Sequence, residues 1–252
     1  MKTKTIILGI AILYLLLSFS VVFVPDADMY SFLTEEDGLF EYLTALFWLV
    51  AAILLLIVFF RDQRGNDFHW LKTRKNIFFI LLAVVFFFGA GEEISWGQRI
   101  IGWQSPEAFV QTNIQKETNI HNLSIFNRKD AEGNRKSFWG LFLNFDRLFT
   151  FFSISYCLII PILDKTLKSV RKWIRLLNLP IVPIWLGILF PINYLVSKAI
   201  ESSVVQARVW GVTEVKESVF AFLFVMVASI FLLQLKGVSS RLWSVEKKPS
   251  LV

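Results

Sequence analysis

The segment AVVFFFGAGEEISWGQRIIGW, residues 83–103, places two adjacent carboxylates near the end of a long apolar run. Ionisable side chains within a membrane segment usually face the protein interior or a water-filled cavity, and they mark a functional site by default. Glu92 and Glu93 lie toward the C-terminal end of their segment, where the helix macrodipole disfavours acids. We therefore predict that both are catalytic residues. The structural alternative is a buried ion pair with Arg99 or Arg147.

A second group of polar residues follows in the loop 102–147. Ser105, Pro106 and Glu107 predict the start of a short helix on the outer surface. In the stretch NIQKETNIHN, Glu117 and His121 are four residues apart and can reach one point. A carboxylate and an imidazole can act as an acid–base pair or bind a divalent metal. A hydrogen-bonded loop over the mouth of the bundle is the equal alternative.

The predicted site joins the carboxylate pair to this loop. Its catalytic residues are Glu92, Glu93, Glu117 and His121, and its candidate metal ligands are Glu93, Glu117 and His121. Orienting or substrate-binding roles are assigned to Gln98, Arg99, Asn119, Asn122, Glu41, Glu214 and Glu217. The last three begin other apolar segments, so they could instead only cap helix N-termini.

The composition indicates a membrane protein that holds these residues in place. Of the 252 residues, 55% are hydrophobic and only 18% are charged, whereas about a quarter are charged in a typical soluble domain. A transmembrane helix needs about 20 apolar residues. Six apolar runs predict an all-α polytopic bundle in one domain, residues 1–252, with a short outer helix and loop between the third and fourth spans. The predicted spans are 5–24, 39–60, 77–101, 148–163, 181–197 and 219–235.

The charge distribution predicts the orientation. Segments 1–4, 61–76, 164–180 and 236–252 hold 16 of the 26 Lys and Arg and 4 of the 20 Asp and Glu. Because basic loops stay in the cytoplasm, both termini are expected there. The basic clusters are expected to contact anionic lipid and not nucleic acid. The first apolar run is too long for a cleaved signal peptide, so a retained span is expected.

Familiar catalytic signatures do not occur in the chain. It contains no HExxH, GxSxG, Walker-type loop or CxxC, and its single cysteine, Cys157, has no partner for a disulfide. The combination of GEEISWGQRIIGWQSPE with NIQKETNIHN resembles a family of bacterial multi-pass membrane proteins with a G-E-E-x-S-W-G-Q signature and no known activity. The resemblance covers about residues 89–123 and implies the bacterial inner membrane.

Three functions fit these features. The first is a membrane-embedded enzyme that acts on a lipid or polyprenyl-linked substrate at the outer leaflet, with a divalent metal as an optional cofactor. The second is a scaffold or assembly factor whose acidic outer face binds a membrane protein partner. The third is a proton- or cation-coupled transporter, which ranks lower because no internal repeat is visible.

Overall fold

The computed structural model describes residues 2–35, 37–62, 75–126, 144–205 and 208–235. Within these ranges the chain is helical, and the only strand-like pairing is an isolated bridge between Asn113 and Leu123. Five helical stretches are long and apolar enough to cross a membrane: Lys2–Phe23, Ala27–Arg61, Phe145–Thr166, Ile184–Glu201 and Val209–Leu235. The protein is therefore an all-α, multi-pass integral membrane protein, as its composition predicts.

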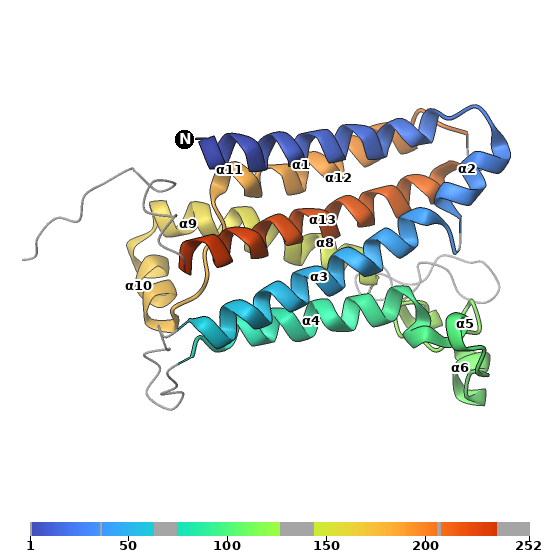
Figure 1. Cartoon of the computed structure of the whole chain (residues 1–252), viewed down its shortest axis with the longest axis horizontal. Coiled ribbons are helices and arrows are strands. Elements are labelled where there is room, and N and C mark those ends of the chain that lie inside the picture. The colour runs from blue at the N-terminus through green and yellow to red at the C-terminus, as the bar shows by residue number, and fades with distance from the viewer. Residues whose placement is uncertain (1, 36, 63–74, 127–143, 206–207, 236–252) are drawn as a thin grey trace, which may run out of the picture.

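The long helices lie side by side along one axis (Figure 1). The elements of the amino-terminal half are α1 (Lys2–Ser20), η1 (Val21–Phe23), α2 (Ala27–Thr34), α3 (Leu39–Arg61) and α4 (Ile77–Glu93). The connecting region holds η2 (Ser95–Gly97), α5 (Gln98–Ile101), α6 (Glu107–Thr112) and η3 (Ser124–Phe126). The carboxy-terminal half holds α8 (Phe145–Ile154), the π-helical η4 (Ser155–Ile159), α9 (Ile160–Thr166), α10 (Lys168–Leu177), α11 (Ile184–Gly187), α12 (Leu189–Glu201) and α13 (Val209–Leu235).

Several predicted span limits are wrong. The third apolar run forms a regular helix only as far as Glu93 and not to residue 101, so α4 has 17 residues. The last span begins at Val209, ten residues before the predicted start at 219. The fourth and fifth spans lie at Phe145–Thr166 and Ile184–Glu201 instead of 148–163 and 181–197. The first two spans lie close to their predicted positions.

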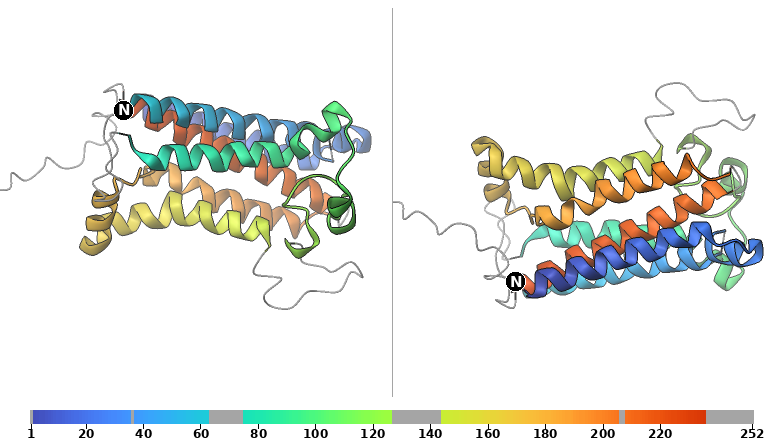
Figure 2. Two further views of the ribbon diagram at one scale, coloured as in Figure 1. Left: turned by 90° about the horizontal axis from the view of Figure 1, so that it is seen from below. Right: turned by 90° about the horizontal axis from the view of Figure 1, so that it is seen from above.

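The main spans form an open arc. α4 packs on α3, α3 on α13, α13 on α12, and α12 on α8, while α1 covers α13. In both views of Figure 2, α12 is seen between α4 and α8. This order leaves α4 and α8 as the two ends of the arc.

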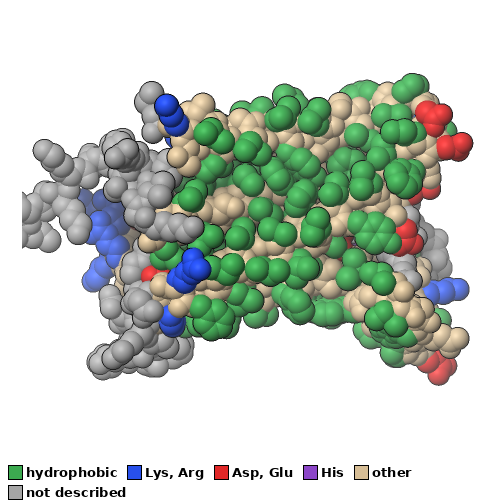
Figure 3. Space-filling model, in the orientation of Figure 1, with side chains coloured by type: hydrophobic (Ala, Val, Ile, Leu, Met, Phe, Trp, Pro, Cys, Tyr) green, Lys and Arg blue, Asp and Glu red, His purple; other side chains and the backbone are tan. Residues whose placement is uncertain are grey.

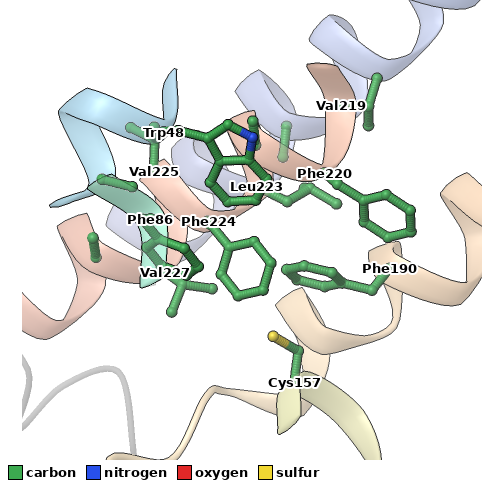
Figure 4. Close-up of a cluster of buried hydrophobic side chains, with 14 of the residues drawn as sticks. Trp48, Phe86, Cys157, Phe190, Val219, Phe220, Leu223, Phe224, Val225 and Val227 are labelled. Atoms are coloured by element: carbon green, nitrogen blue, oxygen red, sulfur yellow. The ribbon is translucent and has the colours of Figure 1, made fainter. Parts of the chain in front are cut away.

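The core of the arc is aromatic. Phe224 of α13 lies 4.6 Å from Phe86, 4.9 Å from Phe190 and 5.6 Å from Trp48 between ring centroids, and these side chains form one cluster (Figure 4). Such tilted and edge-on ring contacts add to the packing energy of apolar burial. The cluster fills the space between α3, α4, α12 and α13 at mid-height.

Proline and glycine shape the fourth and fifth spans. Pro161 has no N–H to donate to the carbonyl of Cys157, and the helix widens into the π-turn Ser155–Ile159 just before it. The same carbonyl lies against Gly187, where an added Cβ would be only 1.9 Å from the oxygen. The fifth span breaks at Ile188, and Pro191 lies in the first turn of α12. Pro191 has no N–H to donate to the carbonyl of Gly187, and this missing hydrogen bond accounts for the break.

The surface agrees with a membrane-spanning bundle. Apolar side chains cover its middle, Lys and Arg side chains gather at the end that carries the N-terminus and α10, and Asp and Glu gather at the opposite end (Figure 3). We call the end that carries the N-terminus and α10 the α10 end. We call the opposite end the cap end, because η2, α5 and α6 cover it (Figure 1).

Candidate functional site

The helix that carries the two carboxylates stops directly after them. Ser95, Trp96 and Gly97 have φ angles of 46°, 55° and 80°, so three successive residues adopt the left-handed region and end α4. The Trp96 ring folds back onto Gly91, where a Cβ would lie 2.8 Å from the ring. Trp96 Nε1 also donates a hydrogen bond of 2.8 Å to Glu92 Oε1. A glycine at 91 is therefore needed for this turn.

Glu92 connects α4 to the loop. Its side chain is buried, and its Oε2 accepts the backbone N–H groups of Ile120 (2.5 Å) and His121 (2.9 Å). His121 Nδ1 lies 3.4 Å from the same oxygen. Both oxygens of Glu92 thus accept hydrogen bonds from the protein, and charge-assisted bonds of this kind are strong. The geometry makes Glu92 an anchor for the loop, and Arg147, one of the two arginines considered as an ion-pair partner, is not among its contacts.

The predicted loop residues form a second network next to this anchor. Glu117 Oε2 accepts hydrogen bonds from Ser95 Oγ (2.5 Å) and Asn119 Nδ2 (3.0 Å). Asn119 Nδ2 also donates a hydrogen bond to Ser95 Oγ, and Asn119 Oδ1 accepts one from Asn113 Nδ2. Asn113 and Asn119 are both buried. Glu117 therefore holds the loop against η2.

Gln98 and Asn122 have similar positioning roles. Gln98 Oε1 accepts the Thr118 N–H at 2.8 Å and the Ser105 hydroxyl at 2.9 Å. Asn122 Nδ2 donates to Gln115 Oε1. The hydroxyl of Ser105 therefore does not cap the short helix, which begins at Glu107 after Pro106. The side chain of Arg99 lies outside the described part of the chain.

A cavity of about 980 Å³ opens beneath this loop. Its wall at the cap end carries Glu41, Glu92, Glu93, Asp146, Glu201, Glu214 and Glu217, together with His121 and Lys198. Its wall toward the α10 end is apolar and includes Trp48, Val84, Val85, Phe86, Phe88 and Phe149. Trp48 and Phe86 belong to the aromatic cluster of Figure 4, and these two rings form the floor of the cavity.

The apolar wall reaches the outer surface of the bundle. Val84 and Val85 of α4 line the cavity although they are 59% and 48% exposed. Phe145 and Phe149 of α8 line it from the other end of the arc. The cavity therefore lies between α4 and α8 and opens sideways between them, at the level of the apolar surface.

Glu93 and Glu217 face this cavity from opposite helices. Neither side chain forms a hydrogen bond with any residue in the described ranges, although both are largely withdrawn from the surface. Glu93 lies within electrostatic range of four other acids, Glu217, Glu214, Glu41 and Glu92. A carboxylate in an apolar region needs hydrogen-bond donors or a positive charge nearby. Glu217 has positive neighbours in Lys216 and His121, whereas the charged neighbours of Glu93 are all acids. Glu93 is therefore the acid of this wall that is best placed to contact a ligand.

The predicted orienting acids Glu41, Glu214 and Glu217 differ in their distance from the start of their helices. Glu41 lies in the first turn of α3, and its Oε2 accepts the N–H of Asp37 at 2.6 Å, so it does support a helix start. Glu214 and Glu217 lie in the second and third turns of α13, since this helix begins at Val209. The capping alternative is therefore wrong for these two residues.

An ion pair that the sequence analysis missed lies next to the cavity. Lys216 is 1% exposed, and its Nζ lies 2.7 Å from Asp146 Oδ1 of α8. Lys198 Nζ similarly lies 2.6 Å from Glu201 Oε2. A buried lysine needs such a partner because isolated charges are costly in low dielectric. The signal was Lys216 itself, which falls inside the last span once that span is extended to Val209.

The predicted metal ligands are not assembled into one site. In the described ranges, no three His, Cys, Asp or Glu side chains are arranged to hold a metal ion. Glu117 accepts hydrogen bonds from Ser95 and Asn119, and His121 contacts Glu92. Glu93, in contrast, faces α13. The structure brings Glu92, Glu93 and His121 to one cavity wall but leaves Glu117 outside it.

No protein-family model, curated protein or solved structure matches the chain. The class of protein therefore follows from the fold, which is that of a multi-pass helical membrane protein.

Proposed function

We propose that the protein is a membrane-embedded enzyme that acts on a lipid or polyprenyl-linked substrate held in the cavity between α4 and α8. The observation that carries the proposal is the union, in one cavity, of two carboxylates without hydrogen bonds to the described chain and an apolar wall that opens sideways. An amphiphile fits such a space because its chain contacts the apolar wall while its head group meets the acids.

The charges of the cavity wall favour a particular kind of head group. Lys198 is paired with Glu201, and His121 lies against Glu92, so these basic groups already have acidic neighbours. Glu217, Glu214 and Glu41 each repel a charged Glu93. A head group rich in hydroxyl or amino donors would relieve this repulsion, as in a lipid-linked sugar or an amine-bearing lipid.

Glu93 is the proposed acid–base residue. As a carboxylate it can accept a proton from a substrate hydroxyl or from an attacking water, and it can return that proton to the leaving group. Glu217 across the cavity would position the head group. Glu92, Glu117, His121, Gln98 and Asn122 would position the loop that covers the cavity, and they would not take part in proton transfer.

The proposed setting is a bacterial inner membrane, with the cap end at the outer leaflet and both termini in the cytoplasm. The charge asymmetry of the loops supports this orientation. The bacterial setting rests on the resemblance of the signature GEEISWGQ, in which Glu92, Ser95, Trp96, Gly97 and Gln98 build the covering turn.

The test uses the full chain in vesicles made from a total lipid extract, with chromatography of the lipids before and after incubation. General acid–base catalysis contributes about 100-fold or more to a rate, so Glu93→Gln should lower lipid conversion by at least that factor. The double variant Glu35→Gln, Glu107→Gln is the control, because it removes two exposed acids at the same end outside the cavity. Conversion that is equal in Glu93→Gln and the control would refute the role of Glu93.

Two other functions have distinct outcomes in the same preparations. Proton-driven uptake that Glu93→Gln abolishes, without any lipid conversion, would assign a coupled transporter. A protein that co-purifies in fixed proportion and is lost with Glu117→Ala would assign a scaffold. The aromatic floor formed by Trp48 and Phe86 closes the cavity toward the α10 end, and this closure favours the enzyme over the transporter.

A further inference from the structure

The helix α10 lies across the end of the bundle and not along its axis (Figure 1). One residue, Leu167, separates it from α9, which is the last part of the fourth span. Arg171 fixes the turn between the two helices, because its guanidinium donates to the carbonyls of Asp164 and Lys165, both at 2.6 Å. These carbonyls belong to the last turn of α9, where they have no partner within their own helix. The orientation of α10 is thus built into the fold.

The two faces of α10 differ in chemistry. Ile174 is buried against the bundle, while Trp173 and Leu176 on its flank are 59% and 37% exposed. The opposite face carries the exposed cations Lys168, Lys172 and Arg175. A short helix with exposed apolar residues beside a basic face is typical of segments that lie in the plane of a membrane interface. Tryptophan is also enriched at that level.

We propose that α10 is a binding surface for anionic phospholipid head groups in the leaflet at the α10 end. Trp173 and Leu176 would insert at the level of the acyl-chain boundary, and Lys168, Lys172 and Arg175 would contact phosphates of lipids such as phosphatidylglycerol. The exposed surface at this end is basic and therefore complementary in charge to anionic head groups. Of the described acids there, Asp62 is 1% exposed and Asp164, in the last turn of α9, is partly buried. Figure 3 shows Lys and Arg side chains gathered at this end.

This inference does not depend on the function of the cavity. The cavity lies at the cap end, between α4 and α8, and no residue of α10 lines it. Loss of enzyme activity in a cavity variant would leave lipid binding by α10 unchanged, and the reverse also holds.

The test is native mass spectrometry of the full chain, titrated with phosphatidylglycerol and with phosphatidylcholine. Each basic residue near an anionic membrane strengthens binding by roughly fivefold. Lys172→Gln with Arg175→Gln should therefore weaken phosphatidylglycerol binding by about 25-fold without changing the binding of phosphatidylcholine. Arg171 is left intact in this variant because it supports the turn.

Two controls separate charge from structure and from position. Lys172→Arg with Arg175→Lys keeps both charges and should keep the wild-type preference. Lys116→Gln with Arg147→Gln removes two exposed charges at the cap end and should leave the preference unchanged. A wild-type protein without preference for phosphatidylglycerol would overturn the proposal, as would equal losses in both neutralised pairs. Retention of soluble polyglutamate in place of phosphatidylglycerol would also overturn it and would assign the surface to an acidic protein.

Discussion

Glu92 and Glu93 are neighbours in the chain, but the helix turns by about 100° between them. Glu92 points at the loop and receives two backbone N–H groups, the indole of Trp96 and an imidazole nitrogen. Glu93 points across the cavity toward α13. The two glutamates therefore have different roles, because the end of α4 directs Glu92 into the hydrogen-bond network of the loop and Glu93 into the cavity.

This division predicts a contrast between two conservative variants. A glutamine at 92 has one acceptor oxygen, so either Trp96 or the backbone of Ile120 and His121 loses its partner. Hydrogen bonds to a charged group contribute about 1.5–3 kcal/mol each. Amide hydrogen exchange at Ile120 and His121 should accelerate at least tenfold in Glu92→Gln, whereas Glu93→Gln should leave these two amides unchanged.

The measurement is hydrogen–deuterium exchange of the full chain in detergent, followed by peptide mass spectrometry over residues 113–123. The untouched amides of α13 provide the internal reference for global stability. Equal protection in wild type and Glu92→Gln would mean that Glu92 does not hold the loop.

At the scale of elements, the sequence predicts which segments cross the membrane better than where they end. The first two spans lie within a few residues of their predicted limits because a charged or polar residue follows each apolar run. The third does not, because Ile94, Ile100 and Ile101 continue the apolar composition after the left-handed turn has ended α4. A hydropathy profile cannot predict this end of the helix, because the turn depends on a tryptophan that folds onto Gly91.

The last span fails for the opposite reason. Glu214, Lys216 and Glu217 interrupt the apolar pattern, so the sequence places the start of the helix after them. In the fold, Lys216 meets Asp146 and both acids face the cavity, and α13 continues through all three. The identities of the candidate residues could therefore be predicted, whereas their partners on other helices required the tertiary arrangement.

The contact between the fourth and fifth spans gives a second prediction. At Gly187 a methyl group would lie 1.9 Å from the backbone oxygen of Cys157, so Gly187→Ala forces the two helices apart. Overpacking of this kind costs about 1–3 kcal/mol. The midpoint of thermal unfolding in detergent should fall. Gly9→Ala is the matched control, because nothing lies within 4 Å of its added Cβ.

The control should be neutral or slightly stabilising, since alanine favours a helix over glycine by up to about 1 kcal/mol. A midpoint for Gly187→Ala that equals that of the wild type would show that α11 does not approach η4 as closely as the structure places it.

At the scale of the whole molecule, the protein has two chemically different ends. The cap end carries the acidic cavity wall and its covering loop, and the α10 end carries an amphipathic basic helix and the N-terminus (Figures 1 and 3). The apolar middle between them matches a membrane. The two proposals assign the cap end to a substrate at one leaflet and the α10 end to anionic lipid at the other.

That orientation is predicted to place the α10 end in the cytoplasm, because basic segments are retained on that side. The buried Cys157 is the one cysteine of the chain, so the wild type should react little with a membrane-impermeant maleimide and provides the background. Gln111→Cys on α6 should be labelled in intact spheroplasts. Ser169→Cys on α10 should be labelled only after the membrane is permeabilised, since both positions are exposed in the fold. Labelling of Ser169→Cys in intact spheroplasts, with protection of Gln111→Cys, would show that the protein has the opposite orientation and that the cavity lies at the cytoplasmic leaflet.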